Sequence, residues 1–244
     1  MGNTKIEWAE STWNPVTGCS KISDGCRNCY AERMAKRLAG RYGYPMDEPF
    51  RPTFHPERLS EPLKWKKPRR VFVCSMGDLF HSDVDDRNIA AVFLRIASLP
   101  IHKFLVLTKR PERMKEFFFT YKFPSGKSLT ETILPNLWIG VTVENDQERH
   151  RIDTLRSIPA AVRFISFEPL LSGIGNIRLQ GISWAIIGCE SGPKRRHCRP
   201  ELAENLVTQC HDAGVPVFVK QADVAGKLVK MPEILGKVWN EYPK

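Results

Sequence analysis

The strongest constraint on the fold is a regular alternation of short apolar runs with amphipathic segments from residue 71 onward. Runs such as Val71–Ser75 are continuously apolar, which is typical of strands buried on both faces. Each run is followed by a segment whose apolar residues recur with helical spacing. This alternation favours a parallel sheet with helices outside it. Strands are expected at 71–75, 104–108, 137–143, 163–167, 184–188 and 215–219, and helices at 85–99, 111–121, 146–158 and 200–213.

These elements predict a partial or complete parallel (β/α) barrel of the triosephosphate-isomerase kind, in the α/β class. A further strand is expected at 13–17 and a further helix at 29–42. We expect one domain over residues 1–244, with a cysteine loop at 12–30 and an extended connection at 45–70. An open doubly wound sheet is the alternative, but the sequence lacks its Gly-x-Gly-x-x-Gly fingerprint.

Composition restricts the cell compartment and the partners. No segment is long and apolar enough to span a membrane, and the N-terminal residues lack the apolar core of a signal peptide. A cytoplasmic protein without a membrane partner is therefore expected, and seven cysteines, an odd number, argue against a disulfide framework. The formal net charge of +10 favours a polyanionic partner, DNA or RNA.

Three of the cysteines are clustered: Cys19, Cys26 and Cys29 have the spacing Cys-x6-Cys-x2-Cys. Three thiolates can hold three irons of a cubane [4Fe–4S] cluster and leave the fourth iron open to another ligand. A structural zinc site normally needs four ligands, and the next candidates, His55 and Cys74, lie far along the chain. The spacing therefore predicts an open-sited iron–sulfur cluster, with a zinc site as the alternative.

Nearly every predicted strand ends at a polar or charged residue, and barrel active sites form at the carboxyl ends of the strands. A ligand on an open iron needs an amine and a carboxylate, so we expect its amino group near Met76–Asp78. Thr142, Glu144 and Asn145 would bond its ribose hydroxyls. The residues predicted from strand ends to bind this ligand are Ser75, Met76, Gly77, Asp78, Thr142, Glu144, Asn145, Ser166, Glu168 and Glu190.

Basic residues near these strand ends predict phosphate contacts. They are Lys109 and Arg110 after one strand, and Lys194, Arg195, Arg196 and Arg199 in the loop after another. A flexible, solvated turn is the alternative for the second group. The run 64–70 is basic and contains a tryptophan, so it would contact phosphates and stack on a base. The alternative is a solvated segment that leads into the next strand.

Cys189 ends the strand at 184–188, where it would supply a hydrogen atom or a thiolate as a catalytic residue. Cys74 and Cys210 lie in apolar patterns and are expected in the core.

Seven blocks in order carry a resemblance: TWNPVTGCSKISDGCRNCYAERMA, SMGDLFH, LTKRPERM, LWIGVTVEN, RFISFEPL, IIGCESGP and VFVKQ. The chain resembles the phage-associated three-cysteine-motif family of radical-SAM-like proteins, of the DUF5131 type. More distantly it is similar to radical S-adenosylmethionine proteins such as spore photoproduct lyase. The resemblance implies a partial barrel, a [4Fe–4S] cluster on the three cysteines and S-adenosylmethionine on its fourth iron, with Tyr30 as the aromatic residue beside the third cysteine. The superfamily's usual spacing is Cys-x3-Cys-x2-Cys, so the longer first gap is a departure.

The resulting hypothesis is a radical S-adenosylmethionine enzyme that generates a 5′-deoxyadenosyl radical to modify or repair DNA or RNA. It implies an electron-donor protein and allows a second protein component. Two alternatives remain open: a non-catalytic nucleic-acid-binding protein stabilised by zinc or a cluster, and a radical enzyme acting on a small molecule.

Overall fold

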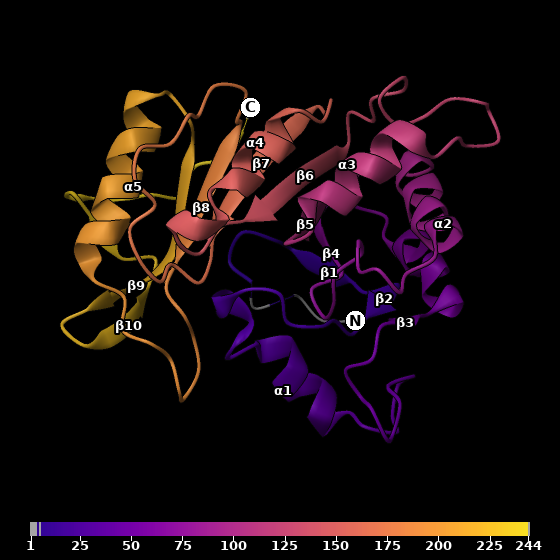
Figure 1. Ribbon diagram of the computed structural model, residues 1–244, viewed down its shortest axis with the longest axis horizontal. Coiled ribbons are helices and arrows are strands. Elements are labelled where there is room, and N and C mark those ends of the chain that lie inside the picture. Colours follow the sequence, from indigo (N-terminus) through magenta and orange to yellow (C-terminus); the bar gives the residue numbers. More distant parts are fainter. Residues whose placement is uncertain (1–3, 5, 244) are drawn as a thin grey trace.

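A curled, eight-stranded sheet organises the computed structural model, which describes residues 4 and 6–243 (Figure 1). Its order is β1-β4-β5-β6-β7-β8-β9-β10, and every neighbouring pair is parallel except β9 and β10. Within the described residues no ladder joins β1 to β10, so the sheet forms a half barrel, compatible with a partial (β/α) barrel. The strands are β1 (Ser11–Trp13), β4 (Arg70–Val73), β5 (Lys103–Thr108), β6 (Leu137–Thr142), β7 (Val162–Phe167), β8 (Trp184–Gly188), β9 (Val217–Val224) and β10 (Lys227–Lys230).

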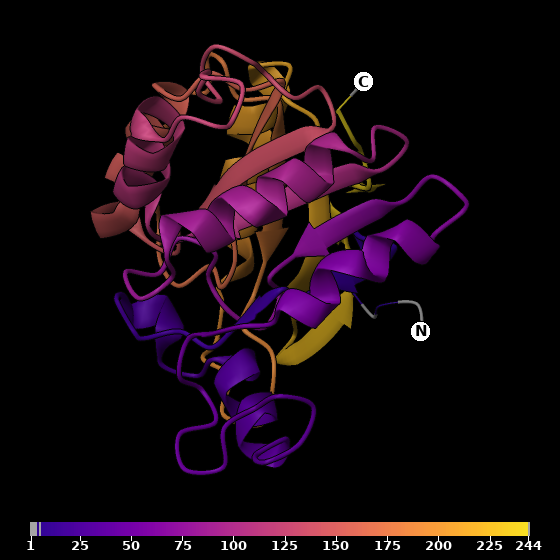
Figure 2. The ribbon, with the colours of Figure 1, turned by 90° about the vertical axis from the view of Figure 1, so that its right-hand side faces the viewer.

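Four helices cover the convex face of the sheet, as Figure 2 shows from the side. They are α2 (Asp86–Ala97), α3 (Pro111–Thr120), α4 (His150–Arg156) and α5 (Pro200–Asp212). Alternate residues of each strand point outward to them, such as Val106 of β5 and Ile165 of β7. Phe93 of α2 and Phe117 of α3 pack against this face, and together these side chains form the main core.

The concave face changes character along the strands. At its base a second apolar cluster contains Trp138, Phe164, Trp184 and Phe218, with Trp8 of the N-terminal segment packed against it. Because side chains repeat every second residue on one face, the same face continues toward the carboxyl ends. There it carries Thr142, Ser166, Gly188 and Lys220. The strand ends thus present polar groups above an apolar base.

The predicted strand at 13–17 is wrong in extent. It divides into β1 and the short β2 (Val16–Thr17), which pairs with β3 (Thr53–Phe54) in a separate ladder. Pro15 cannot donate a hydrogen bond, so the chain leaves the main sheet there. Asn14 marks the departure: its Oδ1 accepts hydrogen bonds from Met76 N at 2.9 Å and from Ser75 Oγ at 3.2 Å.

Two helix predictions were also too long. The segment expected at 29–42 is helical only in α1 (Tyr30–Arg37), and the chain then turns through Gly40, whose φ is +69°. The segment expected at 146–158 is a 3-10 turn, η3 (Asp146–Glu148), followed by α4. The connection at 45–70 contains η2 (Pro56–Lys64), and a further turn, η1 (Asp24–Cys26), lies in the cysteine loop.

The sequence did not predict the C-terminal elements. The strand expected at 215–219 begins two residues further on and continues to Val224, where the chain turns into the antiparallel β10. The short pair β11 (Glu233–Ile234) and β12 (Lys237–Val238) follows. The other expected strands and helices agree with the structure to within two residues at each end. Among the described helices, none has the length and apolar character needed to cross a membrane.

Candidate functional site

The cysteine loop, residues 18–29, lies at the carboxyl ends of the parallel strands (Figure 1). It enters beside the end of β4 through a parallel bridge between Gly18 and Gly77, with Gly18 N donating to Met76 O at 2.9 Å. A Cβ atom on Gly77 would lie 2.7 Å from the carbonyl oxygen of Gly18, so only glycine permits this approach. The loop ends at Cys29, which directly precedes α1.

The three clustered cysteines line one cavity of about 170 Å³. All three thiols are free and partly exposed, whereas Cys74, Cys189, Cys198 and Cys210 are buried. Of these four, Cys74 also lines the cavity of the three clustered thiols. The other residues of the predicted site that line this cavity are Tyr30, Ser75, Gly77, Asp78, Lys109, Arg110 and Thr142. The structure therefore brings residues from three separate strand ends, those of β4, β5 and β6, to the same cavity as the thiols.

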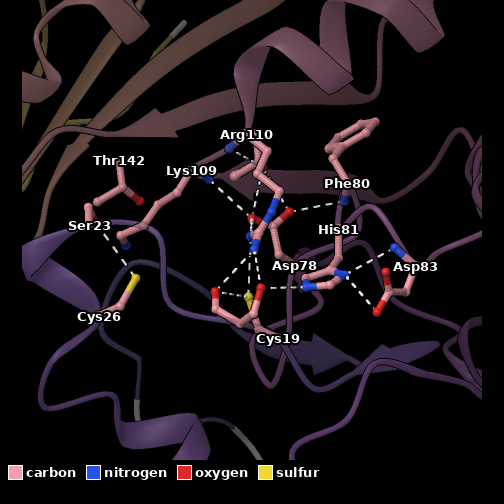
Figure 3. Close-up of polar contacts among 12 residues, drawn as sticks. Cys19, Ser23, Cys26, Asp78, Phe80, His81, Asp83, Lys109, Arg110 and Thr142 are labelled. Atoms are coloured by element: carbon pink, nitrogen blue, oxygen red, sulfur yellow. Dashed lines mark hydrogen bonds and ion pairs between the residues drawn. The ribbon is translucent and has the colours of Figure 1, made fainter.

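The first anchor of the loop is the Asp78 carboxylate (Figure 3). It accepts hydrogen bonds from Thr108 Oγ1 at 2.8 Å and from Arg110 Nη1 at 3.1 Å. Arg110 in turn donates to Cys19 Sγ at 3.3 Å and to the carbonyl and hydroxyl oxygens of Ser20, each at 3.0 Å. Burial and the nearby Asp78 raise the pKa of the Cys19 thiol to about 11, although Arg110 acts in the opposite direction.

The second anchor is a buried ion pair behind the loop. Arg151 of α4 donates to Glu144 Oε2 at 2.8 Å, and the side chains are 3% and 0% exposed. The other oxygen of Glu144 accepts a hydrogen bond from Ser23 Oγ. Gly25 lies so close that a Cβ atom there would be 2.3 Å from the Glu144 side chain. Both carboxylate oxygens of Glu144 therefore have protein partners.

The third anchor is Glu190, at the end of β8. It accepts hydrogen bonds from Asn28 Nδ2 at 2.9 Å and from Arg196 Nη2 at 2.7 Å. Arg196 also donates to Asp24 Oδ2 at 2.8 Å. Burial raises the pKa of Glu190, but the hydrogen bonds from Arg196 and Asn28 outweigh this effect and hold the pKa below its ordinary value.

These three anchors account for the long first gap of the cysteine motif. The six residues between Cys19 and Cys26 include Ser20, Ser23, Asp24 and Gly25, which contact the three anchors. A loop with the shorter spacing would lack some of these contacts. The longer gap therefore gives the loop fixed attachments to three strand ends.

Other predicted residues lie outside the cysteine cavity. Met76 packs with α1 and accepts a hydrogen bond from Tyr30 Oη at 3.4 Å, and Asn145 caps η3. Ser166 donates to Glu168 at 3.1 Å, and Lys220 of β9 forms an ion pair with Glu168 at 3.0 Å. Burial lowers the pKa of Lys220, but Glu168 outweighs this effect and holds it above its ordinary value.

Cys189 points to the helix side of the sheet. It belongs to the main core and does not line the cysteine cavity. Its thiol contacts that of Cys198, and this hydrogen bond lowers the pKa of Cys189 and raises that of Cys198. The catalytic role predicted for Cys189 thus has no direct path to the three clustered thiols.

Several of the basic residues predicted to contact phosphate are held by protein groups. Arg110 is bound to Asp78, Arg196 to Glu190 and Asp24, and Arg195 to Asp223 at 2.5 Å. Lys194 and Arg199 are exposed, and Lys109 points into the cysteine cavity (Figure 3).

Sequence reasoning missed Arg151 as part of the site, and it placed Thr108 and Lys220 at strand ends without giving either a role. Arg151 lies three residues after Glu148 in a helical pattern, which on its own indicates an exposed ion pair. Lys220 was visible as a charged residue at a strand end, but only the tertiary structure gives it the partner Glu168.

Among the described residues, no group of three or more histidine, cysteine, aspartate or glutamate side chains is arranged to hold a metal ion. Cys19, Cys26 and Cys29 line one cavity, and the buried Cys74 lines it as well. In a cubane the cysteines bind different irons, so three thiols around one cavity are a donor set that such a cluster would use. A four-ligand zinc site would take Cys74 as its fourth ligand.

Comparison with known proteins gives a family but no activity. No curated protein and no solved structure matches the chain. A family model described as a protein of unknown function, DUF5131, matches residues 3–243. This confirms the DUF5131 part of the resemblance, and the comparisons support neither its radical-SAM link nor its phage association. The chain therefore belongs to the DUF5131 family.

Proposed function

We propose that this protein is a radical S-adenosylmethionine enzyme that carries a [4Fe–4S] cluster on Cys19, Cys26 and Cys29 and modifies or repairs nucleic acid. The motif blocks resemble radical-SAM-like, phage-associated proteins. Cys19, Cys26 and Cys29 would hold the cluster, and the bound S-adenosylmethionine would supply, on one-electron reduction with cleavage of its S–C5′ bond and release of methionine, a 5′-deoxyadenosyl radical that abstracts hydrogen. An electron-donor protein would supply the reducing equivalent.

The observation that carries the proposal is the shared cavity of the three thiols at the carboxyl ends of a curled parallel sheet. This end of a barrel-like sheet is where active sites form. Ser75, Gly77 and Thr142 line the same cavity and present hydroxyl and backbone groups close to the thiols. They are the residues best placed to hold the amino group and the ribose of the cofactor.

The chain's own residues have separate tasks in this proposal. Asp78 orients Arg110, which donates to Cys19 Sγ. Hydrogen bonds to ligand sulfur help to set the reduction potential of iron–sulfur centres. Glu144, whose oxygens bond Arg151 and Ser23, holds the loop in place. We therefore assign Glu144 to positioning the cysteine loop instead of ribose binding.

The substrate class rests on charge. The net charge of +10 favours a polyanion, since clustered lysine and arginine neutralise phosphates. A small-molecule substrate would leave this charge without a role.

The test is anaerobic reconstitution of the wild type and of Cys26→Ala, with Cys210→Ala as the matched control. Cys26 is partly exposed and outside the apolar core, whereas Cys210 is buried in it. We expect the wild type and the control to hold iron and sulfide and Cys26→Ala to lose both while keeping its circular dichroism spectrum. The electron paramagnetic resonance spectrum of the reduced wild type should change when S-adenosylmethionine is added.

A colourless wild type that retains one zinc ion and shows no spectral change would contradict the proposal and favour the non-catalytic alternative. Production of 5′-deoxyadenosine that depends on added DNA or RNA would support the substrate class. Production that depends only on a small molecule would refute it.

A further inference from the structure

A basic groove runs along the β1 edge of the sheet, outside the cysteine cavity. Two neighbouring hollows form it, of about 640 Å³ and 500 Å³, and both are lined by Arg69. The first is also lined by Ser11 and Thr12 of β1, and by Lys64 and Trp65. The second is also lined by Lys67. Three carboxylates line the hollows as well: Glu61 lines the first, and Glu7 and Glu10, which pair with Lys230 and Arg70, line the second. The segment 64–69 thus borders both hollows.

The lysines of this segment are free for an external anion. Lys64, Lys66 and Lys67 are exposed, and no carboxylate of a described residue lies within ion-pair distance of them. By contrast, Arg110 and Arg196 are bound to carboxylates. A paired cation has little left to offer a phosphate, so this groove is the stronger candidate for phosphate contact.

The groove also offers groups that suit nucleotides. Trp65 is half-buried, with its ring edge-on to His102 at 5.7 Å and the Arg69 guanidinium 5.8 Å from its centroid. Ser11 and Thr12 supply hydroxyl groups along the wall. A positively charged groove with an aromatic side chain is typical of proteins that bind single-stranded nucleic acid.

Asn14 connects the groove with the cysteine cavity. It lines the larger hollow, and its Oδ1 accepts a hydrogen bond at 3.2 Å from Ser75, which lines the cavity. One end of the larger hollow is therefore one hydrogen bond away from a residue that lines the cysteine cavity.

We infer that this groove, with Lys64 and Lys67 of its lining and the exposed Lys66 between them as phosphate contacts, binds the backbone of single-stranded DNA or RNA. The inference rests on the nucleic-acid substrate of the proposed function and names where the chain holds it. Because all three lysines are exposed and have no ion-pair partner among the described residues, removing their charge should leave the fold unchanged.

The test is fluorescence anisotropy with labelled 20-nucleotide single strands of DNA and RNA over a range of salt concentrations. The groove variant is Lys64→Gln/Lys66→Gln/Lys67→Gln, and the matched control is Lys115→Gln/Lys127→Gln/Arg178→Gln, which removes three other exposed cations. Each lost phosphate contact on a single strand lowers the salt dependence by roughly 0.7, so the slope of log K against log salt should become shallower by about 2. Affinity at low salt should fall about tenfold or more, with an unchanged melting temperature.

Equal losses in the groove variant and the control would overturn the inference, because the effect would then be general charge. Wild-type binding that survives the groove change but is lost in Lys194→Gln/Arg199→Gln would place the contact on the loop after β8 and also overturn it. If the wild type binds polyglutamate but no nucleic acid, both the groove's role in nucleic-acid binding and the proposed substrate class are wrong. The proposed cofactor would still be tested separately, by cluster assembly.

Discussion

Replacing Arg151 by methionine tests the anchoring of the cysteine loop. The substitution leaves the Glu144 carboxylate fully buried without its cation, while Ser23 still donates to its other oxygen. Breaking a buried pair by removing one partner costs about 3–5 kcal/mol, because an uncompensated charge remains in the interior. The lost hydrogen bond from Arg151 Nη1 to Thr142 O, 2.9 Å long, adds to this cost.

The magnitude can be measured by urea and thermal unfolding. For a chain of this length, 1 kcal/mol corresponds to about 2–4 °C in melting temperature, so a fall of roughly 6–20 °C is expected. The double variant Glu144→Gln/Arg151→Met should recover about 2 kcal/mol or more, because a neutral amide needs no cation and still accepts from Ser23. Reconstituted Arg151→Met should also lose iron faster than the wild type.

Arg149→Met is the control, because Arg149 is 45% exposed and pairs with Asp146, which is 56% exposed. Its cost should be within about 1 kcal/mol. A loss below 1 kcal/mol in Arg151→Met, or a double variant no more stable than the single one, would refute the reasoning.

Two further predictions concern the loop's entry and its histidines. Gly77→Ala should cost about 1–3 kcal/mol in urea unfolding, because its Cβ would meet backbone atoms of Gly18 at 2.7 Å, whereas Gly173→Ala, with only a contact at 3.9 Å, should be neutral; equal effects would contradict this. Burial lowers the pKa values of His55, His81 and His102. Near pH 6.5 the unfolded chain therefore binds more protons on these histidines than the folded chain does. The free energy of unfolding should therefore be highest above about pH 6.5 and should decrease as the pH falls from 6.5 to 5.5. A free energy of unfolding that stays constant or increases as the pH falls over this range would contradict the prediction.

Much of the fold could be predicted from local sequence patterns. The runs at 104–108, 137–143 and 184–188 are strands in the structure because a continuously apolar run is stable only where both faces are covered. The elements with little apolar pattern were missed. β10, whose residues alternate lysine with leucine and valine, is an antiparallel edge strand held by its pairing with β9, and no local signal reveals that pairing.

For the site, the sequence by itself determined which residues stand at strand ends and which cysteines form a cluster. Parallel strands bring their carboxyl ends to one edge of the sheet, and this places Ser75, Asp78 and Thr142 near the thiols. Only the tertiary structure decided which charged side chains pair with other groups of the protein and which do not. Glu144 and Arg196 look alike in the sequence as polar loop residues, yet both are anchors of the cysteine loop because residues 7 and 172 positions away supply their partners. Lys64, Lys66 and Lys67 have no such partners among the described residues, because the fold brings no carboxylate within ion-pair distance of them, although Glu61 lines the same hollow as Lys64.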